Sequence, residues 1–305
     1  MSRQKLAIVT HEACIAHDPG PHHPESPARL RETLKMLASA EFSGLPRFEC
    51  TEAAVDALNT AHTKAYVQSI LALDGHSRQL DADTFVSPGS VKAAKLAAGG
   101  ALNAVDLVMS GEFSAAFAAI RPPGHHAERA QAMGFCLFSN AAIAAFYARK
   151  KFGIKRIAVA DFDVHHGNGT EAIFAGDPNL LYVSSHQSPC YPGTGLVSAG
   201  NSVNLPLLPG SGGTEFRAAW AHAGIPALNR FAPELLIISA GFDAHNSDPL
   251  AQLRLSDSDF AWITRQLIEI ANLHSHGRVV SLLEGGYDLP ALVGSIATHL
   301  REFTA

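Results

Sequence analysis

Short, uninterrupted apolar segments alternate with longer segments of helical periodicity along almost the whole chain, and this alternation limits the folds that it can adopt. Strands that are apolar on both faces belong in the middle of a protein, where helices cover them on each side. A helix that connects one such strand to the next makes the two strands parallel. The sequence therefore predicts an α/β fold, a single domain over residues 1–305 with one central, mostly parallel sheet.

The alternating segments have definite positions along the chain. Six apolar runs are predicted to be buried strands, at residues 6–9, 115–120, 156–160, 180–184, 235–239 and 279–283. Seven segments are predicted to be helices, at residues 26–39, 63–73, 90–110, 140–151, 214–230, 256–272 and 289–303. Ser26, Thr214 and Ser256 stand at the starts of three of these helices and are of residue types that cap helices.

Polar clusters rich in His and Asp directly follow five of the predicted strands. They lie at residues 121–126, 161–166, 185–187, 241–245 and 284–288. In an open α/β sheet, ligands bind at the edge formed by the carboxyl ends of the strands. Any one of these residues alone would suit a helix cap or a loop, but five clusters at one edge favour an active site.

Two carboxylates and one imidazole in these clusters predict a metal site. Asp163 and His165 are two residues apart in an extended segment, so their side chains point the same way, and Asp243 follows another strand. This ligand set suits zinc and leaves one coordination position for water, as in catalytic zinc sites. Fe²⁺ and Co²⁺ accept the same ligands.

A two-metal centre of the arginase type is the alternative reading of these residues. Such a centre needs an Asp-x-His-x-Asp and an Asp-x-Asp motif. Here Gly167 and His245 stand where the additional carboxylates would be. The sequence therefore favours one metal ion.

The adjacent histidines His125 and His126 follow a Pro-Pro-Gly turn and are candidate acid–base catalysts. A hydrogen bond to Asp161 would favour the charged form of His125, whereas Asn168 would orient His126 without adding charge. We therefore expect His126 to be neutral near pH 7 and to act as the general base. His125 would stabilise developing charge.

Tyr287 follows two glycines and is a candidate donor of a hydrogen bond to an oxyanion. Together with the metal and the histidines, it predicts hydrolysis of an amide by metal-activated water. His126 would remove the proton of the water, and a protonated histidine would return a proton to the leaving amine. The chain has no Gly-x-Ser-x-Gly motif that would supply a serine nucleophile.

Composition excludes several other classes of function. The net charge is −5 without a Lys/Arg run, so we expect no nucleic-acid partner, and no apolar stretch is long enough to span a membrane. The four cysteines form no C-x-x-C pair and are expected to be free thiols in a reducing compartment: Cys14, Cys50, Cys136 and Cys190. Because the first apolar run is too short for a signal peptide, we expect a cytoplasmic protein. A homo-oligomer is the expectation for an enzyme of this size.

Six motifs resemble those of the histone deacetylases and their bacterial relatives, the histone-deacetylase-like amidohydrolases and acetylpolyamine amidohydrolases. They are Arg-Pro-Pro-Gly-His-His-Ala (121–127), Met-Gly-Phe-Cys (133–136), Asp-Phe-Asp-Val-His-His-Gly-Asn-Gly-Thr (161–170), Tyr-Pro-Gly-Thr-Gly (191–195), Ala-Gly-Phe-Asp-Ala-His (240–245) and Glu-Gly-Gly-Tyr (284–287). The resemblance implies the arginase/deacetylase fold with a sheet of about eight strands. It also implies zinc at Asp163, His165 and Asp243.

The same resemblance implies two monovalent cations. A potassium ion near the zinc would be bound by the side chains of Asp161 and Ser184 and by the carbonyls of Asp161, Asp163, His165 and Ser185. A second monovalent cation would be bound by the carbonyls of Phe174, Asp177 and Leu180.

The resemblance further implies a tunnel for the acyl-lysine stem, with Phe135 and Tyr191 as its walls and Gly134 leaving room. At the rim, Leu250 stands where a polyamine-selective relative carries Glu, so the rim lacks a group that would select a cation. We therefore expect acetyl-lysine in a protein or peptide, or a similar acylated primary amine, as substrate. A small acetylated polyamine or another metabolite is the alternative, and a catalytically weak acetyl-ligand-binding protein is a third reading.

Overall fold

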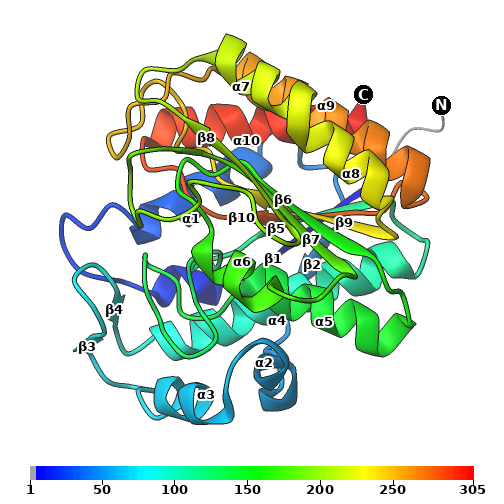
Figure 1. Cartoon of the computed structure of the whole chain (residues 1–305). Coiled ribbons are helices and arrows are strands. Elements are labelled where there is room, and N and C mark those ends of the chain that lie inside the picture. Colours follow the sequence, from blue (N-terminus) through cyan, green and yellow to red (C-terminus); the bar gives the residue numbers. More distant parts are fainter. Residues whose placement is uncertain (1–4) are drawn as a thin grey trace.

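The structure is a computed structural model that describes residues 5–305 (Figure 1). The first four residues, on which the expectation of a missing signal peptide partly rests, lie outside the described part. The main sheet has eight parallel strands in the order β2-β1-β5-β10-β9-β6-β7-β8 within these residues. The predicted α/β fold with one mostly parallel sheet is confirmed.

All six predicted runs form strands, and the sheet also has two strands that were not predicted, at residues 47–49 and 202–207. The sheet consists of β1 (Leu6–Thr10), β2 (Arg47–Glu49), β5 (Ala115–Ala119), β6 (Ile157–Asp161), β7 (Leu180–Gln187), β8 (Ser202–Leu207), β9 (Leu235–Ala240) and β10 (Val279–Leu283). Every residue of β5, β6, β7, β9 and β10 is buried, as expected for strands covered on both faces. A separate antiparallel hairpin consists of β3 (Arg78–Gln79) and β4 (Phe85–Val86).

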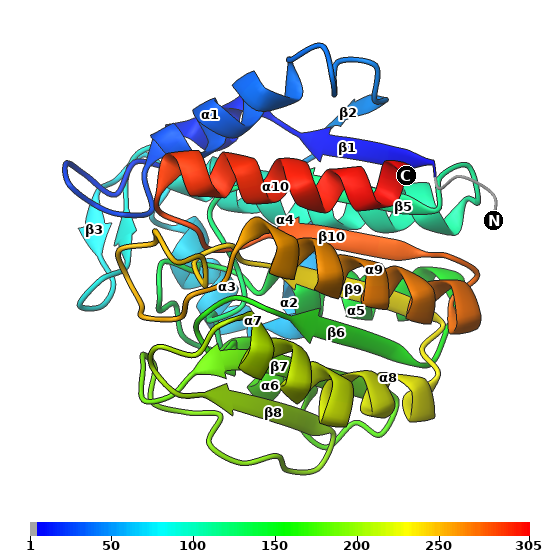
Figure 2. The same cartoon turned by 90° about the horizontal axis from the view of Figure 1, so that it is seen from above.

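Helices cover both faces of the sheet (Figures 1 and 2). One face carries α1 (Pro27–Leu37), α7 (Gly213–Ala219), α8 (Ile225–Phe231), α9 (Asp257–His274) and α10 (Leu289–Thr304). The other carries α4 (Ser90–Met109), α5 (Asn140–Phe152) and α6 (Asn168–Phe174), with α2 (Val55–Ala61) and α3 (Lys64–Leu71) outside them. No helix of residues 5–305 is long and apolar enough to cross a membrane.

The helix predicted at 214–230 differs from the prediction in two ways. It begins one residue earlier, because the Glu215 carboxylate accepts a hydrogen bond from Gly212 N (2.9 Å), so Thr214 is not the cap. A π-helical turn at Trp220–Gly224 also divides it into α7 and α8. At the start of α9, Asp259 Oδ2 accepts hydrogen bonds from both N and Oγ of Ser256 (2.9 Å each), whereas the side chain of Ser26 makes no cap hydrogen bond to α1.

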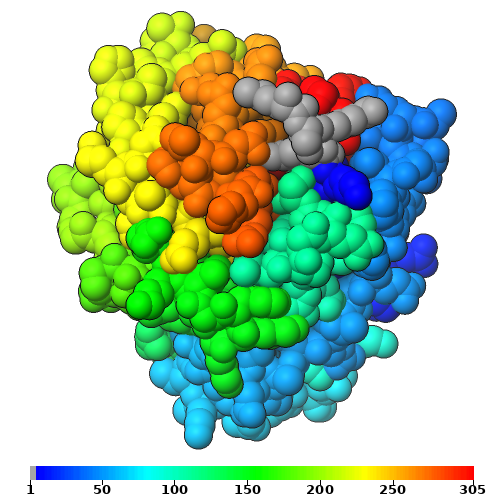
Figure 3. All heavy atoms as spheres, turned by 90° about the vertical axis from the view of Figure 1, so that its right-hand side faces the viewer, coloured from blue at the N-terminus to red at the C-terminus, as the bar shows by residue number. Residues whose placement is uncertain are grey.

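The clusters at 121–126, 161–166, 241–245 and 284–288 begin at or just after the ends of β5, β6, β9 and β10, whereas residues 185–187, predicted to follow a strand, are the last three residues of β7. These five strands are adjacent in the middle of the sheet. In Figure 2 the strands run toward the side of the molecule where the β3–β4 hairpin lies, so the clusters gather there. Figure 3 shows the opposite end, where the teal, green, yellow and orange segments lead into β5, β6, β9 and β10. The fold thus brings all five clusters to one edge.

Candidate active site and metal centre

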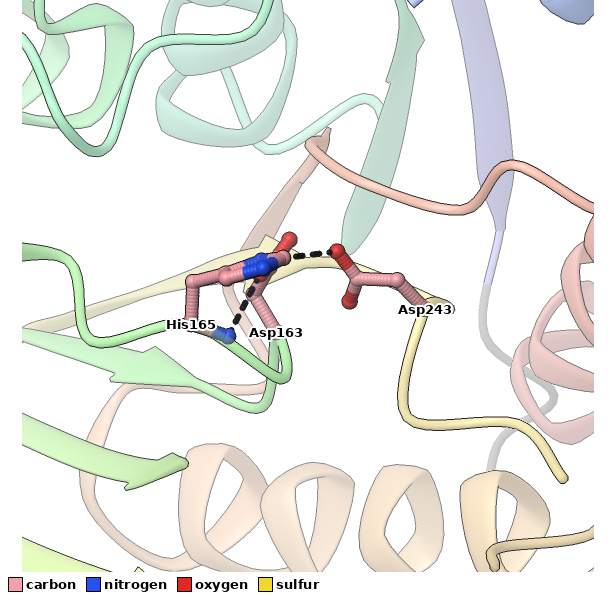
Figure 4. A group of neighbouring side chains, drawn as sticks. All are labelled: Asp163, His165 and Asp243. Atoms are coloured by element: carbon pink, nitrogen blue, oxygen red, sulfur yellow. Dashed lines mark hydrogen bonds and ion pairs between the residues drawn. The ribbon is translucent and has the colours of Figure 1, made fainter. Parts of the chain in front are cut away.

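Asp163, His165 and Asp243 form a buried group whose ligand atoms all lie within 4.8 Å of one another (Figure 4). The first two follow β6 and the third follows β9, the strand that pairs with β6. His165 Nδ1 is 3.1 Å from Asp163 Oδ1 and 3.2 Å from Asp243 Oδ2. The structure therefore brings the three predicted metal ligands together.

Backbone groups fix the two carboxylates in this arrangement. Gly285 N donates to Asp163 Oδ2 (2.8 Å), and Val164 N donates to Asp243 Oδ1 (2.9 Å). In each carboxylate the other oxygen faces the imidazole of His165. Bonds of zinc to N and O ligands at tetrahedral angles place the ligand atoms about 3.3–3.6 Å apart, close to the separations found here.

Charge in this group also fits a divalent cation. Burial and the negative charge of Asp163 raise the pKa of Asp243 to about 7. A divalent cation between the carboxylates would offset both effects. Gly285 makes the approach of the carboxylates sterically feasible, because a Cβ at this position would overlap with Asp243 and come within 2.6 Å of Asp163 Oδ2. The residues present thus fit a bound zinc ion.

The two adjacent histidines have the partners that the sequence predicts. His125 Nδ1 is 3.0 Å from Asp161 Oδ2, and His126 Nδ1 is 2.8 Å from Asn168 Oδ1. Asn168 Nδ2 donates to Glu128 Oε1 (2.7 Å), so the amide oxygen of Asn168 must accept from His126. His126 therefore carries its proton on Nδ1, which leaves Nε2 free to accept another.

These partners separate the pKa values of the two imidazoles. Burial lowers the pKa of His125, but Asp163 and Asp161 outweigh that effect and raise it to about 10. Burial lowers the pKa of His126 well below its usual range, and the nearby charges of His125 and His165 lower it further. Both directions agree with the expectation of a charged His125 and a neutral His126, which stays a prediction.

A cavity of about 200 Å³ opens above these groups. Its lining consists of Asp83, His126, Gly134, Phe135, His165, Tyr191, Leu250 and Tyr287. The four predicted tunnel residues therefore lie around one cavity with the predicted base and phenol. Gly134 has φ +53°, and a Cβ at this position would overlap the ring of His126. Glycine is therefore needed here to leave room for His126 as well as for the stem of a substrate.

Tyr287 is anchored from two sides. Its ring meets that of Phe135 edge-on at 5.9 Å, and the guanidinium of Arg29 lies 5.0 Å from its centroid. Asp248 Oδ2 accepts a hydrogen bond from Tyr287 N (2.7 Å). Burial raises the pKa of the phenol well above its ordinary value, which keeps it protonated.

Asp83 is a residue of the cavity that the sequence reading missed. It lies between β3 and β4, and Asp81 Oδ1 accepts a hydrogen bond from its backbone N (2.8 Å). Burial and Asp81 raise the pKa of the Asp83 carboxyl group. Nε2 of His23 is 3.0 Å from the backbone oxygen of Asp83, and its ring packs against Phe135 with centroids 4.7 Å apart.

Glu284 was also not assigned a role from the sequence. Its buried carboxylate accepts hydrogen bonds from Gly124 N (2.7 Å), His125 N (3.2 Å) and Ser239 Oγ (3.1 Å). Burial raises its pKa to about 7. Glu284 therefore holds the backbone from which the two histidines extend.

The residues assigned to the potassium ion lie together beside the metal ligands. Pairing of β6 with β7 puts Asp161 opposite Ser184, and the residues named as potassium ligands are all buried: Asp161, Asp163, His165, Ser184 and Ser185. The carbonyls assigned to the second cation also converge, but on a side chain. Asn201 Nδ2 donates to Phe174 O (2.8 Å), Asp177 O (3.2 Å) and Leu180 O (2.8 Å).

Comparisons with known proteins agree with this geometry. A sequence profile described as the histone deacetylase domain matches residues 23–303. A probable deacetylase of Archaeoglobus fulgidus is 38% identical, over 92% of this chain and 81% of its own length. A histone deacetylase-like amidohydrolase of Pseudomonas aeruginosa is 36% identical, over 93% of this chain and 82% of its own length. The crystal structure of the HDA15 HD domain is similar with a TM-score of 0.94 at 32% identity, covering 99% of this chain and 89% of that one.

Proposed function

Because the chain belongs to the histone deacetylase family, we propose that it is a zinc-dependent deacetylase that hydrolyses the acetamide of acetyl-lysine in a protein or peptide, or of a similar acylated primary amine. One observation carries the proposal: a single cavity is lined by His126, His165 and Tyr287, a candidate base, a candidate metal ligand and a candidate oxyanion donor. Amide hydrolysis without a nucleophilic side chain needs these three kinds of group.

Asp163, His165 and Asp243 would hold the zinc, which when bound would polarise the amide carbonyl and acidify water. His126 accepts the proton of the attacking water on Nε2, since its Nδ1–H is engaged by Asn168. His125, held charged by Asp161, stabilises the negative charge that develops beside it.

The phenol of Tyr287 donates a hydrogen bond to the oxyanion of the tetrahedral intermediate. Phe135 and Tyr191 contact the apolar stem of the substrate, which aligns the amide with the catalytic groups. A protonated histidine returns the proton to the leaving amine, so the amine departs as a neutral group. Proton transfer and charge stabilisation are thus divided among different side chains.

We also infer one potassium ion at Asp161, Asp163, His165, Ser184 and Ser185. The buried juxtaposition of Asp161 and Ser184 across β6 and β7 supports it.

The cytoplasm stays the expected location of the protein. Its organisation as a single domain and its assembly into a homo-oligomer stay predictions.

A small acetylated polyamine is a second candidate substrate, favoured by Asp83. The sequence reading treated the rim as neutral because of Leu250, yet a carboxylate lines the same cavity. A second ammonium group on the substrate would be attracted to Asp83. Both substrates present the same acetamide to the catalytic groups, so the preference for one of them depends on the residues at the rim of the cavity.

A competition experiment tests the proposal. The metal-stripped protein is reconstituted with zinc, and kcat/KM is measured on an acetyl-lysine peptide and on acetylputrescine. We expect the peptide to be preferred by about tenfold or more, because Leu250 removes the group that selects polyamines. Preference for acetylputrescine that disappears in Asp83→Asn would establish the second candidate instead.

Two controls separate catalysis from binding. Tyr287→Phe should lower kcat by about 10²-fold or more with little change in KM, because only the oxyanion contact is lost. The stripped protein without zinc should be inactive and recover on titration with about one equivalent. Tight binding of both substrates without turnover by the zinc-loaded protein would favour an acetyl-ligand-binding protein.

A further inference from the structure

Three backbone carbonyls, spaced three residues apart, point to one place in the turn from α6 to β7. They belong to Phe174, Asp177 and Leu180, and the turn repeats the same bond twice, since Asp177 N donates to Phe174 O (3.2 Å) and Leu180 N to Asp177 O (3.1 Å). A repeat of three residues puts successive carbonyls on one side of the backbone. Converging carbonyls of this kind are suitable ligands for a monovalent cation, and the family resemblance assigns one here.

The side chain of Asn201 already occupies the point of convergence. Its Nδ2 lies 2.8, 3.2 and 2.8 Å from the three carbonyl oxygens, and Gly176 N donates to its Oδ1 (3.3 Å). The opposite orientation of the amide would set an oxygen against three oxygens and an NH₂ group against an N–H. The hydrogen bonds on both ends therefore fix which atom faces the carbonyls.

The backbone of Asn201 holds the side chain in this position. Tyr182 N donates to Asn201 O (3.0 Å), so the residue directly before β8 is attached to β7. Asp177, the acidic residue within the turn, is paired with Arg149. An ion at the three carbonyls would have to displace the amide.

We propose that the Asn201 side chain takes the place of the second monovalent cation and closes this turn without an ion. The turn connects α6, which begins at Asn168, to β7, which carries Ser184 and Ser185. Asn201 thus supports both segments by hydrogen bonds alone. This proposal does not depend on the deacetylase activity, and its test uses no substrate.

Diffraction from crystals of the wild-type protein soaked in rubidium chloride tests the proposal directly, because Rb⁺ replaces K⁺ and scatters anomalously. We expect no anomalous peak within coordination distance of Phe174 O, Asp177 O and Leu180 O. A rubidium ion bound by these three oxygens would overturn the proposal.

A thermal-stability series tests the competition between amide and ion. The gain in Tm from choline chloride to potassium chloride at equal ionic strength is compared between wild type and Asn201→Ala. A surface hollow of about 440 Å³ reaches Gly176, Asp177 and Asn201, so ions have access to the site once the amide is removed. We expect the variant to gain about 2–4 °C more than the wild type when K⁺ is in tenfold excess over its dissociation constant.

Asn204, three residues after Asn201, provides the matched control, Asn204→Ala. The amide of Asn204 also donates to oxygens, Glu171 Oε1 (2.7 Å) and Val197 O (3.1 Å). It should lower Tm by the same amount in both salts. An equal potassium gain in Asn201→Ala and wild type would overturn the proposal. Should Asn201→Ala fail to fold, the diffraction experiment on the wild type still decides.

Discussion

At the scale of single residues, Glu284 determines where the two histidines stand. Its carboxylate receives two backbone N–H groups, from Gly124 and His125, and the hydroxyl of Ser239. The two backbone donors belong to the turn that carries the histidines, and Ser239 belongs to β9. A buried acid thus connects the end of β10 to the loop after β5 and to β9.

Replacement of Glu284 by Ala should be strongly destabilising. It leaves buried N–H groups without an acceptor, at about 1–3 kcal/mol for each, so the free energy of unfolding should fall by about 3 kcal/mol or more. Glu284→Gln is the matched variant, because its amide oxygen can accept from the same N–H groups. Urea unfolding measures the free energy of unfolding of both variants. Equal decreases in the two variants would contradict the role of Glu284 in holding the backbone of the histidines.

At the scale of elements, Arg29 connects α1 to the loop that carries Tyr287. Arg29 on α1 donates to Gly286 O through Nε (2.6 Å) and to Glu284 O through Nη2, and pairs with Glu25 (2.8 Å). All of these contacts are fully buried. The planar guanidinium group donates hydrogen bonds to three acceptors at the same time.

Arg29→Lys should therefore impair catalysis while retaining the charge. An ammonium group can keep the pair with Glu25 but cannot reach both carbonyls, so the Tyr287 loop loosens and kcat should fall about tenfold with KM changed less. Steady-state kinetics on an acetyl-lysine peptide measures this. The exposed Arg31 of the same helix provides the control, and a comparable loss in Arg31→Lys would refute the explanation.

The sequence predicted the central strands because their apolar runs are uninterrupted and clearly separated by helical segments. β2 and β8 were missed, since both lie at sheet edges, where β2 is short and partly exposed and β8 contains Pro206. The partners of His125 and His126 were predictable from residue type and spacing. Asp83 was not, because its place at the cavity depends on how a two-stranded hairpin folds back over the sheet edge.

At the scale of the whole molecule, two buried histidines outside the site make the fold sensitive to acid. His299 lies between Thr264 (2.7 Å) and Ser281 (2.9 Å), and His62 bonds Glu128 O (2.9 Å). Burial lowers the pKa of His299 to about 3 and that of His62 to about 4. Both are therefore neutral in the folded protein at neutral pH.

Stability should accordingly fall as the pH drops below about 6.5, the pKa of an unfolded-state histidine. Above that pH neither state binds the extra proton. Below it the unfolded chain does and the folded protein does not until about pH 4 for His62 and pH 3 for His299. By the linkage relation, the proton that each histidine does not bind in the folded state lowers the free energy of unfolding by roughly 2–3 kcal/mol at pH 4.5.

Urea unfolding at pH 7.5 and 4.5 measures this loss. His299→Gln cannot be protonated, so the variant should lose less stability than the wild type between the two pH values. The exposed His76 provides the control, since His76→Gln should leave the loss unchanged. If His299→Gln lost as much stability as the wild type between pH 7.5 and 4.5, the explanation would be ruled out.

The order of strands in the sheet also matters while the protein is being made. A ribosome completes β10 after every other strand of the sheet, yet β10 lies between β5 and β9. Until residues 279–283 emerge, the earlier strands can pair only as two separate sets, β2-β1-β5 and β9-β6-β7-β8, and the N–H and C=O groups of β5 and β9 that face β10 lack their partners. Such edges invite pairing with other chains, so synthesis passes through an aggregation-prone stage. Insertion of β10 ends it and joins the half that carries His125 to the half that carries Asp163.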